Sequence, residues 1–180
     1  MILVVGLAGS GKSTQCQMLE TTGRYKWLSV GQLLRTKIED PKHKAIIDSG
    51  DVLGDDTVLP LVEEYLREHS KEQTRELILD GFPRSLSQAK WLSDLKNKHQ
   101  IHITEVIHIM ATPETTLPRL LKRGRTDDHD TAIKERFSEY ESKILPILDY
   151  LRDKRVPIIE VDGEATPETV HQQIVTALGR

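Results

Sequence analysis

The most constraining feature of the sequence is a glycine-rich run, residues 6–13 (GLAGSGKS), that directly follows a short apolar segment. That segment, residues 2–5, reads Ile-Leu-Val-Val and is typical of a strand buried on both faces of a parallel sheet. The glycine-rich run matches the phosphate-loop pattern in full, and a helical segment begins at Lys12. Strand, loop and helix in this order predict a site for the phosphates of a nucleotide.

The residue types in this loop explain how it would hold phosphates. Glycines allow backbone N–H groups to turn inward on the phosphate oxygens, and the N-terminus of the following helix adds positive potential. Lys12 is long enough to reach the β and γ phosphates, and the Ser13 hydroxyl is a ligand for Mg²⁺. Asp80 closes another apolar run, so we expect its carboxylate at the end of a neighbouring strand, facing the loop and its magnesium ion.

The remaining apolar runs define the fold class. They occupy residues 27–30, 77–80, 106–110 and 157–161, and the polar segments between them are long enough to hold helices. Strands that alternate with helices predict a doubly wound α/β fold with a five-stranded parallel sheet, of the phosphate-loop NTPase type, whose first strand is central. A chain of 180 residues with 37% hydrophobic residues predicts one domain over residues 1–180.

The helical segments are less regular than the strands. Residues 31–75 exceed what one crossover helix needs and contain breaks at 40–41 and 49–51, which predicts an inserted helical subdomain. Pro146 interrupts the helical spacing of residues 128–153, so we expect a kink there. Pro118 falls inside another helical pattern, and that helix either begins late or bends. Pro167 suits the first position of the last helix.

Composition excludes several classes of function. The formal net charge of −3 shows no basic excess of the kind that marks proteins binding nucleic acids or anionic membranes. Cys16 is the only cysteine, which excludes an intramolecular disulfide and a cysteine-based zinc site and fits a reducing cytoplasm. The seven histidines have no metal-site spacing. No apolar run reaches signal-peptide or membrane-spanning length, so we expect a soluble, cytoplasmic protein.

Several motifs together resemble one known family, the adenylate kinases. Residues 80–84 (DGFPR), followed by Gln88, resemble the family's monophosphate signature. Residues 9–16 are similar to its phosphate loop and residues 28–35 to its first monophosphate-binding helix. Residues 119–125 (RLLKRGR), with Asp127, Asp128 and Arg136, are similar to its lid region. The resemblance covers nearly the whole chain in the same order.

The resemblance implies a role for each matching residue. The residues that it places on ATP are Gly9, Ser10, Gly11, Lys12, Ser13, Thr14, Arg119, Arg123 and Ala165. Those that it places on AMP are Val30, Arg35, Asp51, Val52, Leu53, Gly81, Phe82, Pro83, Arg84 and Gln88. The implied catalytic residues are Lys12, Arg84, Arg123, Arg125 and Arg136, and the implied magnesium site is Ser13 with Asp80, the latter through water.

Within these sets, the resemblance implies that Arg35 and Arg84 hold the phosphate of AMP and that Gln88 reads the adenine edge. Arg119 would stack on the base of ATP. The implied partners are ATP with Mg²⁺ and AMP, with no zinc, and the implied state is a monomer. Residues 30–59 would form the monophosphate-binding subdomain, and residues 124–127 would form a vestigial lid.

The chemistry of phosphoryl transfer explains the arginines independently of any family. The reaction needs neutralised charge and alignment, and a planar guanidinium grips phosphate oxygens with two hydrogen bonds. A nucleoside monophosphate already presents an ionised oxygen near neutral pH, so no general base is required. The acidic cluster at residues 127–130 is expected to cap the following helix and to pair with nearby arginines.

The sequence also departs from the family pattern. Val30 and Gln32 stand where adenylate kinases usually carry threonine and aspartate, and Ser13 and Gly54 replace a common glycine and proline. Only residues 124–126 are expected to join the helices that flank the lid. The missing hydroxyl at Val30 favours an alternative, a UMP/CMP-type kinase, whereas Gln88 opposes it.

Two other classes of protein also carry a phosphate loop. A GTP-driven switch needs an Asn-Lys-x-Asp motif, and the nearest match, residues 97–100 (NKHQ), lacks the aspartate. A non-catalytic ATP-binding module would have lost Lys12, Asp80 or the arginines of the monophosphate site, all of which are present. The sequence therefore favours a kinase that phosphorylates nucleoside monophosphates.

Overall fold

One parallel sheet organises the structure, a computed structural model that describes residues 1–49, 53–69, 74–99, 101–125 and 128–179. In this part of the chain five strands pair in the order β2-β3-β1-β4-β5. They are β1 (Ile2–Gly6), β2 (Tyr25–Ser29), β3 (Glu76–Asp80), β4 (Glu105–Met110) and β5 (Ile158–Asp162). The predicted five-stranded parallel sheet with a central first strand is confirmed.

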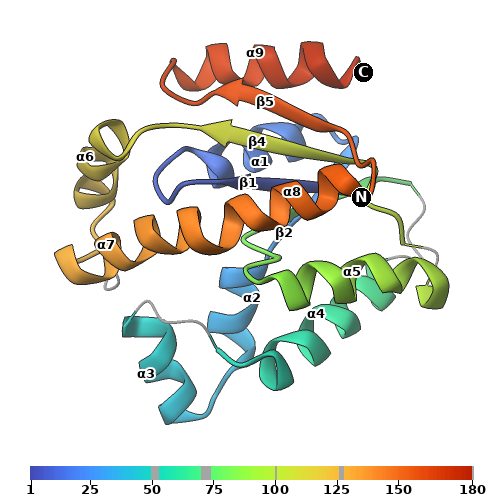
Figure 1. The fold of residues 1–180 in the computed structure, drawn as a ribbon, viewed down its shortest axis with the longest axis horizontal. Coiled ribbons are helices and arrows are strands. Elements are labelled where there is room, and N and C mark those ends of the chain that lie inside the picture. Colours follow the sequence, from blue (N-terminus) through green and yellow to red (C-terminus); the bar gives the residue numbers. More distant parts are fainter. Residues whose placement is uncertain (50–52, 70–73, 100, 126–127, 180) are drawn as a thin grey trace.

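Helices cover both faces of this sheet (Figure 1). They are α1 (Lys12–Thr21), α2 (Val30–Lys37), α3 (Pro41–Ser49), α4 (Asp55–His69), α5 (Leu86–His99), α6 (Pro113–Arg123), α7 (Asp130–Glu139), α8 (Leu145–Asp153) and α9 (Pro167–Leu178). A π-helical segment, η1 (Tyr140–Ile144), connects α7 to α8. None of these helices is long and apolar enough to span a membrane.

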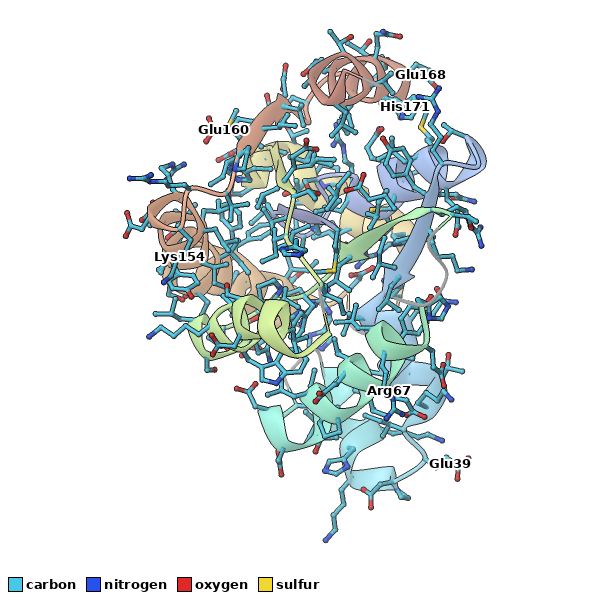
Figure 2. The ribbon with its side chains drawn as sticks, turned by 90° about the vertical axis from the view of Figure 1, so that its right-hand side faces the viewer. Glu39, Arg67, Lys154, Glu160, Glu168 and His171 are labelled. Atoms are coloured by element: carbon cyan, nitrogen blue, oxygen red, sulfur yellow. The ribbon has the colours of Figure 1, made fainter. Side chains whose placement is uncertain are left out.

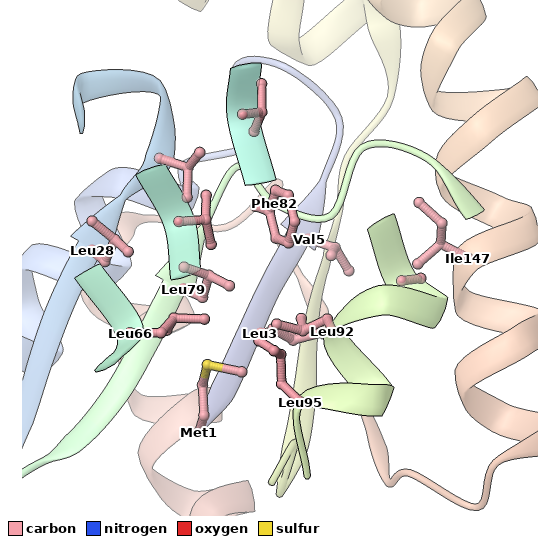
Figure 3. Packing of buried hydrophobic residues seen from close by; sticks show 14 of the residues in the cluster. Met1, Leu3, Val5, Leu28, Leu66, Leu79, Phe82, Leu92, Leu95 and Ile147 are labelled. Carbon is pink, nitrogen blue, oxygen red and sulfur yellow. The ribbon is translucent and has the colours of Figure 1, made fainter. Parts of the chain in front are cut away.

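The two cores follow from the alternation of side chains along β1. Leu3 and Val5 point to one face and pack with α4, α5 and α8, as Figure 3 shows. Ile2 and Val4 point to the other face, where they pack with α1 and α9. Because successive side chains of a strand point to opposite faces, a strand covered on both sides is apolar throughout. Cys16 is fully buried in the second core, and burial raises the pKa of its thiol.

Three helices, α2, α3 and α4, occupy the long stretch between β2 and β3. Figure 2 shows Glu39 and Arg67 of this stretch at one end of the molecule, and Glu168 and His171 of α9 at the opposite end. The second strand ends one residue earlier than expected, because Val30 begins α2. The reason is local: the Ser29 side chain accepts a hydrogen bond from the Gln32 N–H and caps the helix.

The prolines behave differently from one another. Helix α6 does not begin late at Pro118, because the Thr112 side chain caps it and Pro113 occupies its first turn. Pro118 then lies inside the helix. The irregularity expected at Pro146 lies just before that residue, in η1, and Pro146 itself is in the first turn of α8. Proline lacks an N–H group, so the first turn, whose N–H groups have no partner within the helix, accommodates it.

A buried polar contact joins the sheet to η1. His108 of β4 is 5% exposed, and its Nε2 lies 2.6 Å from the hydroxyl of Tyr140. Its Nδ1 lies 3.8 Å from the Glu160 carboxylate of β5, too far for a hydrogen bond. Burial lowers the pKa of His108; the nearby Glu160 opposes this shift, and Arg152, which is 3.7 Å from Glu160, adds to it. The folded chain therefore favours the neutral imidazole.

This burial predicts a loss of stability in mild acid. The unfolded chain has the ordinary histidine pKa of about 6.5, and the folded pKa is lower, so protons bind the unfolded state more strongly. We expect the free energy of unfolding to fall as the pH drops from about 7 to about 5. In His108→Gln, whose amide can pair with Tyr140 without titrating, the fall should be smaller. Urea unfolding at both pH values tests this, and equal falls in the two proteins would contradict it.

Candidate functional site

The loop between β1 and α1 is shaped by its glycines and packs against α6. Gly9 has φ of +83°, and a Cβ there would lie 2.9 Å from the Thr116 carbonyl oxygen and 3.0 Å from Cγ of Leu120. A side chain at this position would be both strained and crowded. Gly11, with φ of +97°, precedes the first residue of α1. The loop thus lies directly against the helix that carries Arg119 and Arg123.

Lys12 is folded back on its own loop. Its Nζ donates hydrogen bonds to the carbonyl oxygens of Gly6 and Leu7, at 2.9 and 2.8 Å. Burial lowers the pKa of Lys12 to about 8; the Asp80 carboxylate opposes this shift, whereas Arg84 and Arg123 reinforce it. A half-buried cation with two arginines and a single carboxylate nearby is stabilised further when another anion arrives. The arrangement is suited to receiving phosphate.

Asp80 lies beside the loop, as expected from its place at the end of a strand. It is the last residue of β3, which pairs with β1 in a register that sets Val4 opposite Asp80. Its carboxylate accepts a hydrogen bond from Ser13 Oγ at 2.8 Å, and the residue is 4% exposed. A carboxylate and a hydroxyl are the oxygen ligands that Mg²⁺ prefers, so this pair fits the ion that accompanies ATP.

A cleft of about 370 Å³ opens above the loop. It is lined by Gly9, Ser10, Gly11, Lys12, Ser13, Thr14, Gln15, Arg119, Leu120, Arg123, Arg125, Gly163, Ala165, Pro167 and Val170. All the residues that the resemblance places on ATP are therefore brought together. Sequence reasoning missed Gly163, whose carbonyl accepts a hydrogen bond from Arg119 Nη1 at 2.9 Å. Its position directly after β5 could have identified it, because ligands bind at the carboxyl ends of parallel strands.

A second, smaller cleft of about 90 Å³ lies next to the first. It is lined by Val4, Val5, Gly6, Ala8, Lys12, Gly81, Phe82, Pro83, Arg84, Arg136, Glu139, Tyr140 and Ile144. The signature at residues 81–84 thus faces Arg136, which comes from α7. Lys12 lines both clefts and marks the point where they meet.

Several other residues expected to touch AMP do not line either of these two clefts. Val30 and Leu53 are 2% and 4% exposed, and both side chains belong to the core shared with β1 and α4. Arg35 is exposed, with its guanidinium beside Gly31. Asp51 and Val52 lie outside the described residues.

Gln88 is buried and its carboxamide is hydrogen-bonded at both ends. Its Oε1 accepts from the backbone N–H of Arg84 at 2.7 Å, and its Nε2 donates to the carboxylate of Asp55 at 2.7 Å. The side chain therefore connects the signature loop before α5 to the first turn of α4. The contact with Asp55 was not foreseen from the sequence.

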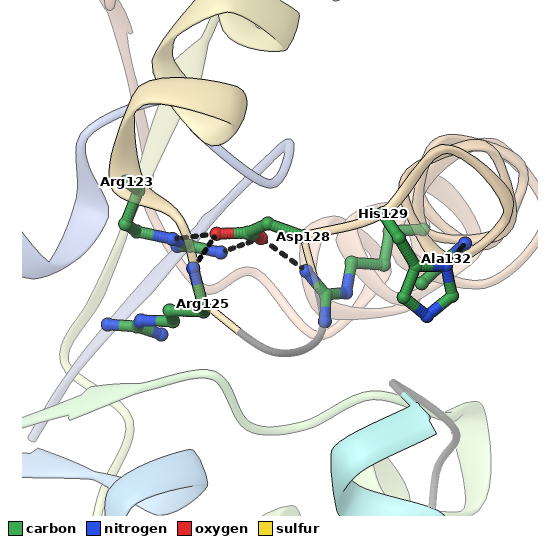
Figure 4. Close-up of polar contacts among 6 residues, drawn as sticks. Arg123, Arg125, Asp128, His129 and Ala132 are labelled. Carbon is green, nitrogen blue, oxygen red and sulfur yellow. Dashed lines mark hydrogen bonds and ion pairs between the residues drawn. The ribbon is translucent and has the colours of Figure 1, made fainter.

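Asp128 holds the arginines of the lid region together (Figure 4). Its carboxylate accepts from Nε and Nη2 of Arg123, from the Arg125 backbone N–H, and from Arg136 Nη1 at 3.2 Å. Burial alone would raise the pKa of Asp128, but the hydrogen bonds from Arg123 and Arg125 and the positive charge of Arg136 hold it below its usual value. The predicted pairing of the acidic cluster with arginines is confirmed for Asp128.

The segment between the flanking helices is longer than expected. Helix α6 ends at Arg123 and α7 begins at Asp130, so residues 124–129 join them, rather than 124–126 alone. The reason is that the His129 side chain accepts from the Ala132 N–H and caps α7, which starts the helix after the acidic pair. Capping by this cluster was predicted. Thr126 and Asp127 lie outside the described residues.

Comparisons with known proteins agree with this geometry. A model of the adenylate kinase family matches residues 4–156. The chain is 34% identical to an adenylate kinase of Mycolicibacterium paratuberculosis and 33% identical to one of Mycobacterium tuberculosis, in each case over 99% of both chains. It is 32% identical to adenylate kinase 1 of a Nostoc species, over 99% of this chain and 98% of the relative.

The lowered pKa of Lys12 predicts proton uptake when ATP binds. With a pKa of about 8, half of the Lys12 amines are neutral at pH 8, and the phosphates raise the pKa on binding. We expect uptake of about half a proton at pH 8 and much less at pH 6.5. Titration calorimetry in buffers of different ionisation enthalpy measures this. Lys12→Arg, which stays charged, is the control, and equal uptake by both proteins would rule the prediction out.

The hydrogen bonds of Asp128 predict that this residue stabilises the folded protein. Asp128→Asn removes the negative charge that two arginines bind and so weakens their hydrogen bonds. We expect the free energy of unfolding to fall by about 1–3 kcal/mol. Asp130→Asn, an exposed residue of the same cluster, should change it by less than about 0.5 kcal/mol. Urea unfolding of the three proteins decides the matter. If D128N were as stable as D130N, the hydrogen bonds of Asp128 would not contribute to the stability of the fold.

Proposed function

The chain belongs to the adenylate kinase family and is a phosphotransferase whose reaction is ATP + AMP = 2 ADP, and we propose how its two clefts perform this reaction. ATP occupies the larger cleft, and the phosphate of AMP lies at the smaller one. The observation that carries the proposal is that Lys12 lines both clefts. A cation at this junction meets the phosphoryl group as it passes from the donor to the acceptor, which is where charge develops.

In the larger cleft, the loop amides hold the β and γ phosphates and Lys12 exchanges the carbonyls of Gly6 and Leu7 for phosphate oxygens. Arg119 packs along the base of ATP, near Ala165. Ser13 and Asp80, which are hydrogen-bonded to each other, would hold Mg²⁺, Asp80 through water. When bound, the ion neutralises charge on the phosphates. Adenylate kinases use it with ATP as a general property of the family.

Arg84, on the wall of the smaller cleft, and Arg35, which does not line that cleft, hold the phosphate of AMP, and Gln88 contacts the base. Arg84 is suited to this role because it lies on the cleft wall together with Arg136 and Lys12. Gly81, Phe82 and Pro83 shape the same wall. Val30 and Leu53 support the base-binding side from the core, and we assign Asp51 and Val52 to contacts with the base. Residues 30–59 thus form the monophosphate-binding subdomain.

Arg84, Arg123, Arg125 and Arg136 neutralise the transferring phosphoryl group. Asp128 binds the guanidinium groups of Arg123 and Arg136 and the backbone N–H of Arg125, which keeps these residues beside the two clefts before the nucleotides bind. The monophosphate oxygen is already ionised, so the protein needs only to align it in line and exclude water. We assign residues 124–127 to a vestigial lid, so exclusion of water depends on the helix ends that flank it and on their arginines; adenylate kinases are themselves one of the examples from which lid closure in enzymes is known.

The partners are small nucleotides, and we place the protein in the cytoplasm as a monomer. The net charge of −3 offers no basic surface of the kind that nucleic acids or anionic membranes attract. Its single cysteine is buried, which suits a reducing compartment.

A coupled assay for ADP tests the function. With ATP, Mg²⁺ and AMP, CMP, UMP or GMP as acceptors, we expect strong preference for AMP. Arg84→Lys keeps the charge but loses the planar fork, and kcat/KM for AMP should fall on the order of 10²-fold or more. Arg24→Lys, an exposed arginine in the turn before β2, is the matched control. Preference for CMP or UMP would overturn the choice of acceptor, and full activity of R84K would overturn the role of Arg84.

A further inference from the structure

Asp55 of α4 is hydrogen-bonded to Gln88 of α5. Asp55, the first residue of α4, accepts from Gln88 Nε2 through Oδ1 at 2.7 Å and from the Ser87 hydroxyl through Oδ2 at 2.8 Å. The Ser87 hydroxyl also lies 2.7 Å from that of Ser85, which in turn accepts from the Gln88 N–H at 3.2 Å. Both carboxylate oxygens of Asp55 are thus engaged by the turn that carries Gln88.

These contacts fix which way round the Gln88 carboxamide lies. A carboxylate accepts hydrogen bonds only, so the nitrogen of the amide must face Asp55. The backbone N–H of Arg84 donates only, so the oxygen must face Arg84. A flipped amide would set two acceptors against each other at Asp55 and two donors against each other at Arg84. Gln88 is 2% exposed, so either clash would be costly.

The fixed amide has one N–H and one oxygen lone pair left for a ligand, because a carboxamide carries two of each. Adenine presents a ring-nitrogen acceptor next to an amino donor, which such an amide matches with two hydrogen bonds. Hypoxanthine and guanine present a carbonyl acceptor next to a protonated ring nitrogen, which is the reverse pattern. A flipped amide would match those bases instead.

We propose that Asp55 is a specificity-determining residue that selects adenine by holding the Gln88 carboxamide in one orientation. It is a positioning residue, since it acts through Gln88 rather than on the base. The inference rests on the proposed function, in which Gln88 contacts the base of AMP. In this proposal the contact between α4 and α5 positions the side chain that binds the base.

The test compares AMP with IMP, whose base carries the reversed pattern in a similar shape. Asp55→Asn keeps the shape of the side chain, but its amide can accept or donate, so a flipped Gln88 no longer clashes at residue 55 and clashes only at the Arg84 N–H. The wild type should prefer AMP, and the ratio of kcat/KM for AMP to that for IMP should fall by about tenfold or more in D55N. Asp55→Glu retains an acceptor-only group and should preserve the preference.

Asp56→Asn is the matched control, because it removes the same charge from the same first turn of α4 and should leave the ratio within about twofold. If D55N does not fold, Asp55→Ser replaces it, since a hydroxyl also both donates and accepts. An equal loss of activity with AMP and IMP, with the ratio unchanged, would overturn the inference alone. Failure of the wild type to phosphorylate AMP would overturn the proposed function and this inference with it.

Discussion

The site depends on one half-buried cation, Lys12, at the junction of two clefts. Its hydrogen bonds to the carbonyls of Gly6 and Leu7 keep it in place before any nucleotide binds. Burial among positive neighbours leaves its charge poorly stabilised, so the gain on meeting a phosphate is large. The parallel sheet supplies this position, because β1 is central and its carboxyl end delivers the loop between two neighbouring strands. The remaining parts of the site are arranged around that point.

An acidic residue, Asp128, holds two of the arginines in place. Asp128 collects Arg123 and Arg136 from α6 and α7, and thereby holds two helices whose cations would otherwise repel each other. Asp55 plays a comparable part for the base, since it holds a neutral amide in a defined direction. In both places a carboxylate sets the geometry of a group that, in our proposal, contacts the nucleotide. Positive charge and hydrogen-bond direction are thus both fixed before substrates arrive.

Residues whose meaning is local were predicted well. The phosphate loop, Asp80 at a strand end and Pro167 at a helix start all depend on their neighbours in the sequence. Predictions were less accurate at the ends of helices, which individual side-chain caps determine, and where distant segments meet. The length of the lid connection depended on His129 capping α7, and the irregularity near Pro146 moved into η1, whose Tyr140 pairs with His108 of β4. Val30 lies in the core because Ser29 starts α2 one residue earlier than the apolar pattern suggested.

The sequence by itself determined the order of strands and helices, the phosphate loop and the set of cations that a phosphoryl group needs, because strand alternation and the glycine pattern are written in neighbouring residues. Only the tertiary structure decided which of these residues meet. Lys12, Arg84 and Arg136 come from three separate segments and share one cleft. Asp55 and Gln88 are 33 positions apart and form one hydrogen bond. Contacts of this kind depend on how helices pack across the sheet, which no local pattern records.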